Sequence, residues 1–162
     1  MKFFVTKEIR ENRPLVGMLI GMNLMILIYL AANAWMLGES VGISAASVAA
    51  SVLGDGEFGE PMELGTMVES VHSALFIGAI GIMITLSLLL RLSRNDRFNL
   101  LMTIGIFASF IGMHGTLFLI RFVSPGWVDA YLGSFYLYHL MMGSVTVFNL
   151  YRLSVGEKRH GS

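Results

Sequence analysis

Four long apolar runs dominate this chain of 162 residues. They extend over residues 15–37, 67–90, 98–120 and 128–150. An α-helix needs about 20 residues to cross about 30 Å of hydrocarbon, and each run is at least that long. The helices of a soluble bundle keep a charged face, which the interiors of these runs lack. The runs therefore predict an all-α fold, in which a single integral membrane domain forms a four-transmembrane-helix bundle.

The composition agrees with a lipid environment. Hydrophobic residues make up 55% of the chain and charged residues 14%, with no cysteine. So few charges exclude an ordinary soluble globule, a disordered chain and a nucleic-acid-binding protein. Without cysteine the chain has no disulfide, thiolate metal site or cysteine nucleophile. A metal ion would need histidine, methionine, carboxylate or backbone oxygen as its ligands.

Residues typical of helix starts lie near the beginnings of the apolar runs. Pro14 suits the first turn of a helix, where its missing N–H costs nothing. The segment 66–69 reads Thr-Met-Val-Glu, which predicts a capping box at the start of the second helix. Asn95 or Asp96 is expected to cap the third helix. The Ser-Pro-Gly sequence at 124–126 predicts a tight turn before the fourth.

The basic residues predict the orientation. Ten of the eleven cations fall before the first run, between the second and third, or after the fourth: Lys2, Lys7, Arg10, Arg13, Arg91, Arg94, Arg97, Arg152, Lys158 and Arg159. Acidic residues gather at the opposite side: Glu39, Asp55, Glu57, Glu60, Glu63, Glu69 and Asp129. By the positive-inside rule both termini are cytoplasmic, and only Arg121 breaks the pattern. The expected location is a bacterial or archaeal cytoplasmic membrane.

The outer loop 38–66 is the one long connection. Its part 41–53 is rich in Ser, Ala and Val but too short to span, so we expect an interfacial helix that caps the bundle. An alternative concerns the N-terminus, where Ala32-Asn33-Ala34 resembles the cleavage site of a secretory signal. Since the preceding run is long enough to span, an intact anchor helix is the preferred interpretation.

Three histidines lie inside the runs, each on a different helix: His72, His114 and His139. Ionisable residues in a membrane are costly and are candidates for function. The turn at Pro125 makes the third and fourth helices antiparallel neighbours. His114 precedes Pro125 by eleven residues and His139 follows it by fourteen, which puts them within about 4–5 Å in depth. They are therefore expected to face one another across a bound group.

Other residues suit a flat, acidic cofactor beside these histidines. Arg121 lies on the same face of its helix as His114, where a guanidinium could pair with a carboxylate. Phenylalanines share that face, and packing alone also explains them. Gly143 lies four residues after His139 and leaves room beside it.

A metal site is the alternative. Glu69 and His72 are three residues apart on one helix face, the spacing of carboxylate-bridged metal sites in bundles. With His114 and His139 they could form a three-histidine, one-carboxylate site for copper, iron or zinc. For His72 alone, a ligand, a hydrogen-bonding group for a quinone and an interhelical hydrogen bond remain open. For Glu69 the capping box is the simpler explanation.

With this helix arrangement, His72, His114, His139 and Arg121, the chain from Met67 to Leu153 resembles the small membrane b-type cytochromes. The resemblance implies haem b between two histidines, here His114 and His139, and electron exchange with quinone and an attached partner. Members with two haems need four axial histidines. This chain has three inside the membrane, with His160 in the polar tail, so the resemblance implies at most one bis-histidine haem.

Three functional hypotheses follow. The first is a membrane electron-transfer subunit that holds haem b. The second is a non-haem metal protein built on the same histidines. The third is a non-catalytic integral subunit or assembly partner of a larger membrane complex. A GxxxG motif at 17–21 suggests close packing of the first helix within the chain or onto other membrane subunits or a second copy. The longest extramembrane segment has fewer than thirty residues, so any soluble active site belongs to another polypeptide.

Overall fold

The computed structural model describes residues 12–54 and 59–155, which form five α-helices and one short 3₁₀ turn. In chain order these are α1 (Arg13–Ser40), α2 (Ala45–Leu53), α3 (Leu64–Leu92), α4 (Asp96–Phe122), η2 (Pro125–Trp127) and α5 (Val128–Ser154). The expected all-α fold is confirmed. The segment 41–53 contains a helix, α2, which begins at Ala45 because Ser44 caps it through the Ser47 backbone N–H, and its interfacial position stays a prediction.

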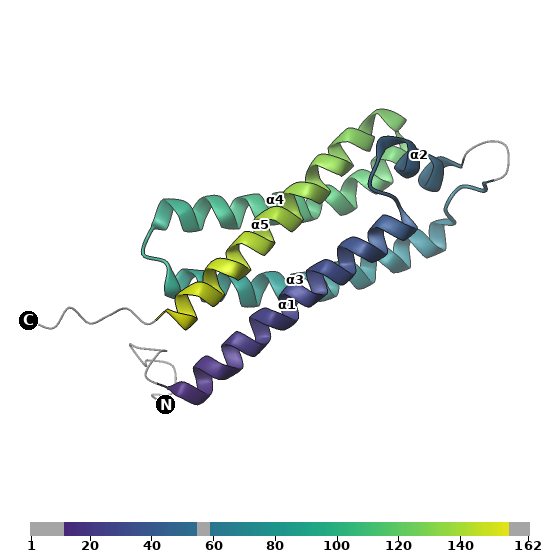
Figure 1. Ribbon diagram of the computed structural model, residues 1–162. Helices are drawn as coiled ribbons and strands as arrows, with labels where there is room; N and C mark the ends of the chain where they lie inside the picture. Colours follow the sequence, from purple (N-terminus) through teal and green to yellow (C-terminus); the bar gives the residue numbers. More distant parts are fainter. Residues whose placement is uncertain (1–11, 55–58, 156–162) are drawn as a thin grey trace, which may run out of the picture.

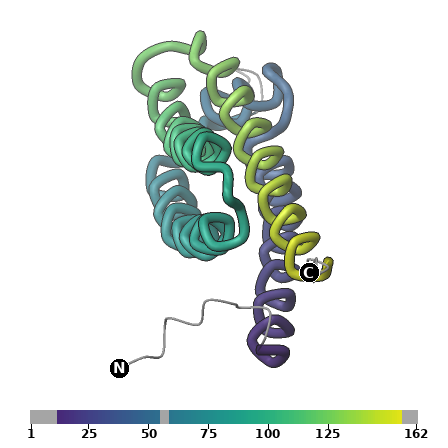
Figure 2. The backbone as a smooth tube through the Cα atoms, turned by 90° about the vertical axis from the view of Figure 1, so that its left-hand side faces the viewer, coloured from purple at the N-terminus to yellow at the C-terminus, as the bar shows by residue number. Residues whose placement is uncertain are grey.

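The helix α5 occupies the centre of the bundle. It shares its most extensive interface with α4, and it also packs against α1 and α3. Figures 1 and 2 show α4 and α5 running antiparallel from the turn η2, with α1 on the other side of α5. The short α2 packs on α4 and α5 near η2 and closes that end of the bundle, as expected.

Three of the four predicted spans are candidate membrane spans by length and composition. The helices α1, α3 and α4 are each long and apolar enough to cross a membrane. The helix α5 has 27 residues, the same number as α4, but it is not among them. Tyrosines, serines, His139 and Asn149 lower its hydropathy. Some of its polar side chains, such as Thr146 and Asn149, are buried against other helices.

The helix ends confirm most of the predicted signals. Pro14 lies in the first turn of α1, and the Asn95 side chain caps α4 by accepting from the Phe98 backbone N–H at 3.1 Å. The Ser124 hydroxyl accepts from the Gly126 N–H and supports the turn at η2. The capping box expected at 66–69 is wrong. The helix α3 already begins at Leu64, so residues 66–69 lie inside the helix, and its N-cap is Glu63 without a side-chain cap.

Two hydrogen bonds fix α2 and the residues just before it to the bundle. Arg121 donates from Nη1 to the Val52 carbonyl at 3.2 Å, and the Tyr136 hydroxyl donates to the Ile43 carbonyl at 2.9 Å. Arg121 thus satisfies a carbonyl in the last turn of α2, where a helix leaves its carbonyls without intrahelical partners. The structure thus gives Arg121 a role in holding α2, and its expected place beside a cofactor carboxylate stays a prediction.

Arg121→Met is expected to loosen the C-terminal end of α2. A hydrogen bond from a charged donor contributes about 1.5–3 kcal/mol, so backbone amides near Val52 should exchange with deuterium about tenfold faster or more. Hydrogen-exchange mass spectrometry measures this. Tyr136→Phe serves as the control because it releases the segment just before α2, near Ile43. Unchanged exchange at Val52 in Arg121→Met would show that apolar packing alone holds α2.

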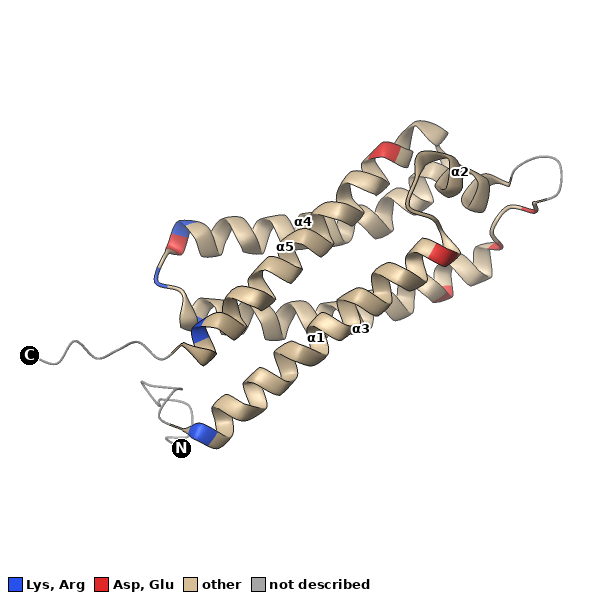
Figure 3. Ribbon diagram, viewed as in Figure 1, with Lys and Arg blue, Asp and Glu red and all other residues tan. Residues whose placement is uncertain are grey.

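The described charges follow the predicted asymmetry. Figure 3 shows Lys and Arg residues at the end where α1 begins and α5 ends, and most Asp and Glu residues at the opposite end. Asp96, in the first turn of α4, is the acidic exception at the basic end. Several charges used for the orientation lie outside the described residues: Lys2, Lys7, Arg10, Asp55, Glu57, Lys158 and Arg159. His160 lies outside them as well.

Candidate functional site

His139 joins α5 to α1. Its Nδ1 lies 2.8 Å from the Phe135 carbonyl, and because a carbonyl only accepts, Nδ1 carries the proton of the neutral ring. Its Nε2 is then an acceptor, and it lies 3.4 Å from the Asn33 Nδ2. The bond to the backbone fixes the tautomer of His139, and Asn33 fixes the direction in which the ring points.

Asn33 is the site residue that the sequence analysis missed. In the sequence Asn33 stands out only as part of a cleavage-site pattern. In the structure it is a buried residue about two turns before the end of α1, with a side chain that is 5% exposed. An amide deep within an apolar run is the signal that could have revealed it, since a polar side chain in hydrocarbon needs a partner. The partner is on a helix about a hundred residues away.

The Asn33–His139 contact is expected to couple α1 and α5 energetically. Interhelical hydrogen bonds in membrane proteins contribute about 0.6 kcal/mol on average and up to about 1.7 kcal/mol. Asn33→Ala, His139→Ala and the double variant should therefore show a coupling energy in that range in a denaturant or thermal unfolding cycle. Strictly additive effects would mean that the two side chains do not interact.

His114 occupies a different environment. Its side chain is 4% exposed, and its Nε2 is buried without a hydrogen-bond partner. The Phe110 ring meets it edge-on at 5.0 Å between centroids and packs on the Tyr138 ring at 5.2 Å. Phe110 also lies against Gly78 of α3. His114 therefore belongs to the packed interface of α3, α4 and α5, whereas His139 faces α1.

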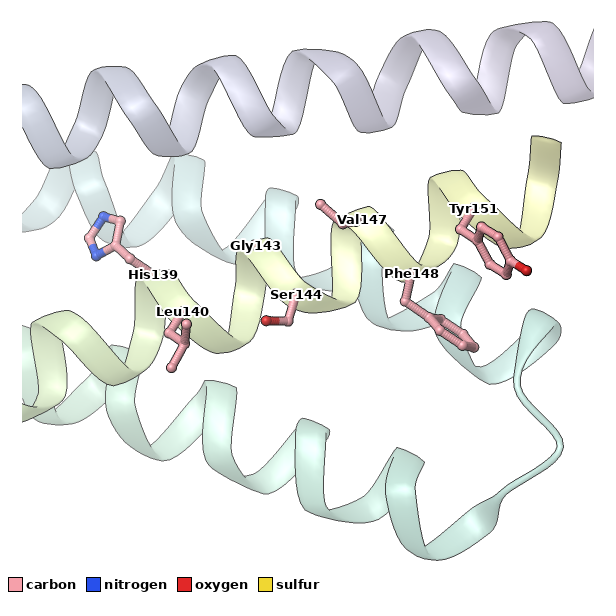
Figure 4. Close-up of a pocket in the computed structure, with 7 residues that line it drawn as sticks. All are labelled: His139, Leu140, Gly143, Ser144, Val147, Phe148 and Tyr151. Carbon is pink, nitrogen blue, oxygen red and sulfur yellow. The ribbon is translucent and has the colours of Figure 1, made fainter. Parts of the chain in front are cut away.

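An open groove runs along α5 from His139 toward the basic end of the bundle. It has a volume of about 660 Å³ and is lined by His139, Leu140, Gly143, Ser144, Val147, Phe148 and Tyr151. Figure 4 shows these side chains on α5, with His139 pointing toward α1. A Cβ atom added to Gly143 would meet nothing within 4 Å, so the groove is open there, as expected from sequence. His114 does not line it.

The predicted metal site is not formed. Glu69 and His72 are both exposed on α3, and the described residues contain no group of three or more His, Asp or Glu side chains that could hold a metal ion. The rotation of α3 explains the difference, since its buried face carries Val71 and Gly78 and turns His72 outward. His114 and His139 are likewise separated, because one faces the α3–α4–α5 interface and the other faces α1.

Comparison with known proteins yields one match. A family model described as a transmembrane helical domain matches residues 42–160, which include α2, α3, α4 and α5. No curated protein and no solved structure matches the chain. The match extends over well over half of the sequence and includes every residue that lines the groove.

Proposed function

The chain belongs to the transmembrane helical domain family and is an integral membrane protein. From this premise we propose that it is a membrane subunit that binds the head group of a quinone in the groove along α5 and serves electron transfer together with a partner subunit. The single observation that carries this proposal is the groove itself, which combines an apolar wall with a histidine of fixed tautomer at one end.

The chemistry of the groove suits a quinone. A flat apolar ring and an isoprenoid tail match walls made by Leu140, Val147 and Phe148. His139 offers an acceptor at Nε2, which would take the hydrogen bond of a quinol hydroxyl. The Asn33 amide, now near Nε2, would then be free to donate to the same ligand. Ser144 supplies a further hydroxyl in the middle of the groove.

The proposal includes four spans with both termini on the cytoplasmic side. The helix α5 has 27 residues, which at 1.5 Å per residue reaches about 40 Å and is ample for about 30 Å of hydrocarbon. Its antiparallel packing along α4 supports the same depth for both helices. The described arginines at the ends of α1, α3 and α5 support the cytoplasmic assignment of that end.

Photoaffinity labelling tests the quinone site. The full chain in lipid nanodiscs would be irradiated with a short-chain quinone that carries a photoreactive tail, and the labelled peptides identified by mass spectrometry. We expect label on residues 139–151 that an excess of unlabelled quinone removes. Label that only phospholipid displaces, or label spread evenly over the lipid-facing helices, would contradict the proposal and leave a non-catalytic subunit as the function.

Haem b held by His114 and His139 is a second candidate. Two observations favour it: the Nδ1–H of His139 bonds to a carbonyl, as in many metal-ligating histidines, and the Nε2 of His114 has no partner. A bis-histidine haem needs both imidazole rings on one ligand, whereas His114 and His139 lie at different interfaces, which favours the quinone. If haem is bound, protein purified after expression with adequate haem should show a Soret band that His114→Ala and His139→Ala each remove. A spectrum without the band excludes this candidate.

A further inference from the structure

A buried polar layer crosses the bundle between α1, α3 and α5. It consists of Asn23, Thr85 and Asn149, whose side chains are each 0% exposed. Leaving a polar group unpaired in an apolar interior costs about 1–3 kcal/mol, so such groups usually have a partner in the protein or an ordered water. Three of them on three helices call for an explanation, and the histidine groove does not include them.

Each residue of this layer has one oxygen without a partner. Asn149 donates from Nδ2 to the Thr85 carbonyl at 3.0 Å, and Asn23 donates from Nδ2 to the Leu19 carbonyl at 2.8 Å. Because a carbonyl only accepts, these bonds fix which amide atom is nitrogen, and the two Oδ1 atoms are left unpaired.

The hydroxyl of Thr85 is unpaired as well. Thr116 and Thr146 behave differently, since each donates to the carbonyl four residues earlier in its own helix. Such a bond satisfies a threonine inside a helix without any outside partner. Thr85 makes no bond of this kind, so its hydroxyl is available to a ligand.

The neighbouring contacts bring the three helices together at this level. Leu19 of α1, Leu88 and Leu92 of α3 and Leu153 of α5 pack in one small cluster. Leu19 and Leu153 each lie four residues from an asparagine of the layer, toward the basic end of the bundle, and Leu88 lies three residues from Thr85 in the same direction. On the other side, Gly81 of α3 faces Met142 of α5. This leucine cluster is distinct from the main apolar core, and the layer borders it on α1, α3 and α5.

The register of α1 and α5 places the two asparagines at one depth. Asn33 contacts His139, and the helices run antiparallel. Asn23 precedes Asn33 by ten residues, and Asn149 follows His139 by ten. At 1.5 Å per residue, both asparagines lie about 15 Å from that contact, toward the basic end of the bundle.

We propose that Asn23, Thr85 and Asn149 together bind one occluded water molecule. A water donates two hydrogen bonds, here to the two Oδ1 atoms, and accepts one, here from the Thr85 hydroxyl. These three bonds satisfy each unpaired oxygen and equal the usual number for a buried water. A cation fits less well, because it would leave the hydroxyl proton unpaired and the three ligands bring no negative charge. The water site does not depend on the quinone site.

Magnetisation transfer from water tests the site. In nanodiscs that contain the full chain with isotope-labelled asparagine, NMR would record transfer from water to the side-chain amides of Asn23 and Asn149. We expect strong transfer to both in the unmodified protein and a loss of at least half of it in Thr85→Val. Thr146→Val is the matched control, because that hydroxyl is already bonded within α5, and it should leave the transfer unchanged.

The unmodified protein gives a decisive result even if a variant fails to fold. Absence of transfer to the two amides would overturn the proposal. So would equal transfer in Thr85→Val and the unmodified protein, since the threonine would then hold no part of the water. The same amide resonances would also be compared in sodium chloride and in choline chloride. Chemical shifts of these amides that change with sodium alone would assign the site to a cation instead.

Discussion

Gly143→Phe is expected to weaken quinone binding at least tenfold. The glycine lies in the middle of the groove, and its missing side chain leaves space in which an added Cβ meets nothing within 4 Å. A phenyl ring there would fill the groove without pushing against another helix, so the fold should survive while the ligand loses its place. A tenfold change corresponds to about 1.4 kcal/mol, less than the apolar contacts of a bound ring supply. Equilibrium binding of a short-chain quinone to nanodiscs measures the effect.

Gly133→Phe is the matched control for this experiment. Gly133 lies on the same helix, is exposed, and also has nothing within 4 Å of an added Cβ, but it does not line the groove. Its substitution should leave the affinity within twofold of the unmodified protein. Equal weakening by both variants would mean that the quinone associates with the lipid-facing surface in general. No weakening by Gly143→Phe would place the ligand elsewhere.

Gly78→Ala is expected to destabilise the bundle by about 1–3 kcal/mol, the usual cost of overpacking a well-packed interior. A Cβ atom at Gly78 would lie 2.5 Å from the ring of Phe110. That ring is held between His114 and Tyr138 and cannot turn away easily. The helix α3 must therefore move away from α4. Thermal unfolding in detergent, followed by circular dichroism, should give a lower midpoint.

Gly81→Ala provides the comparison on the same helix. Its added Cβ would lie 3.9 Å from the Cε atom of Met142, which is ordinary contact with a flexible side chain. The midpoint should stay close to that of the unmodified protein, and the helix-favouring alanine should slightly raise it. A similar fall in the unfolding midpoint of both variants would mean that α3 tolerates no added side chain, and that the Phe110 contact is not the specific cause.

The sequence predicted the helices well because their lengths follow from simple constraints. Apolar runs of sufficient length must be helical in a bilayer, where every backbone polar group needs a partner within its own segment. All four long runs are helices, and each extends two to four residues beyond at least one predicted end. The cap at Asn95 and the place of Pro14 in the first turn of α1 depend on local chemistry, and both were predicted. The box at 66–69 failed because the helix begins earlier than its apolar run.

The candidate site was only partly predictable. The sequence singled out His139 and Gly143, and both line the groove. It could not find Asn33 as the partner of His139, because nothing in a sequence states which helices of a bundle touch. It assigned Arg121 to a cofactor, although α2 takes its guanidinium. His72 was grouped with the other histidines, although it lies on an exposed part of α3.

By itself the sequence determined that the chain is helical, lies in a membrane and carries its cations mainly at one end. These properties depend on run length, hydropathy and charge, each of which is local. The tertiary structure alone decided which face of each helix is buried. In a soluble helix a polar stripe marks the outer face, but in lipid the outer and inner faces are both apolar. The rotation of His72, His114 and His139 therefore depends on packing, such as the fit of Phe110 against Gly78, which only the assembled bundle defines.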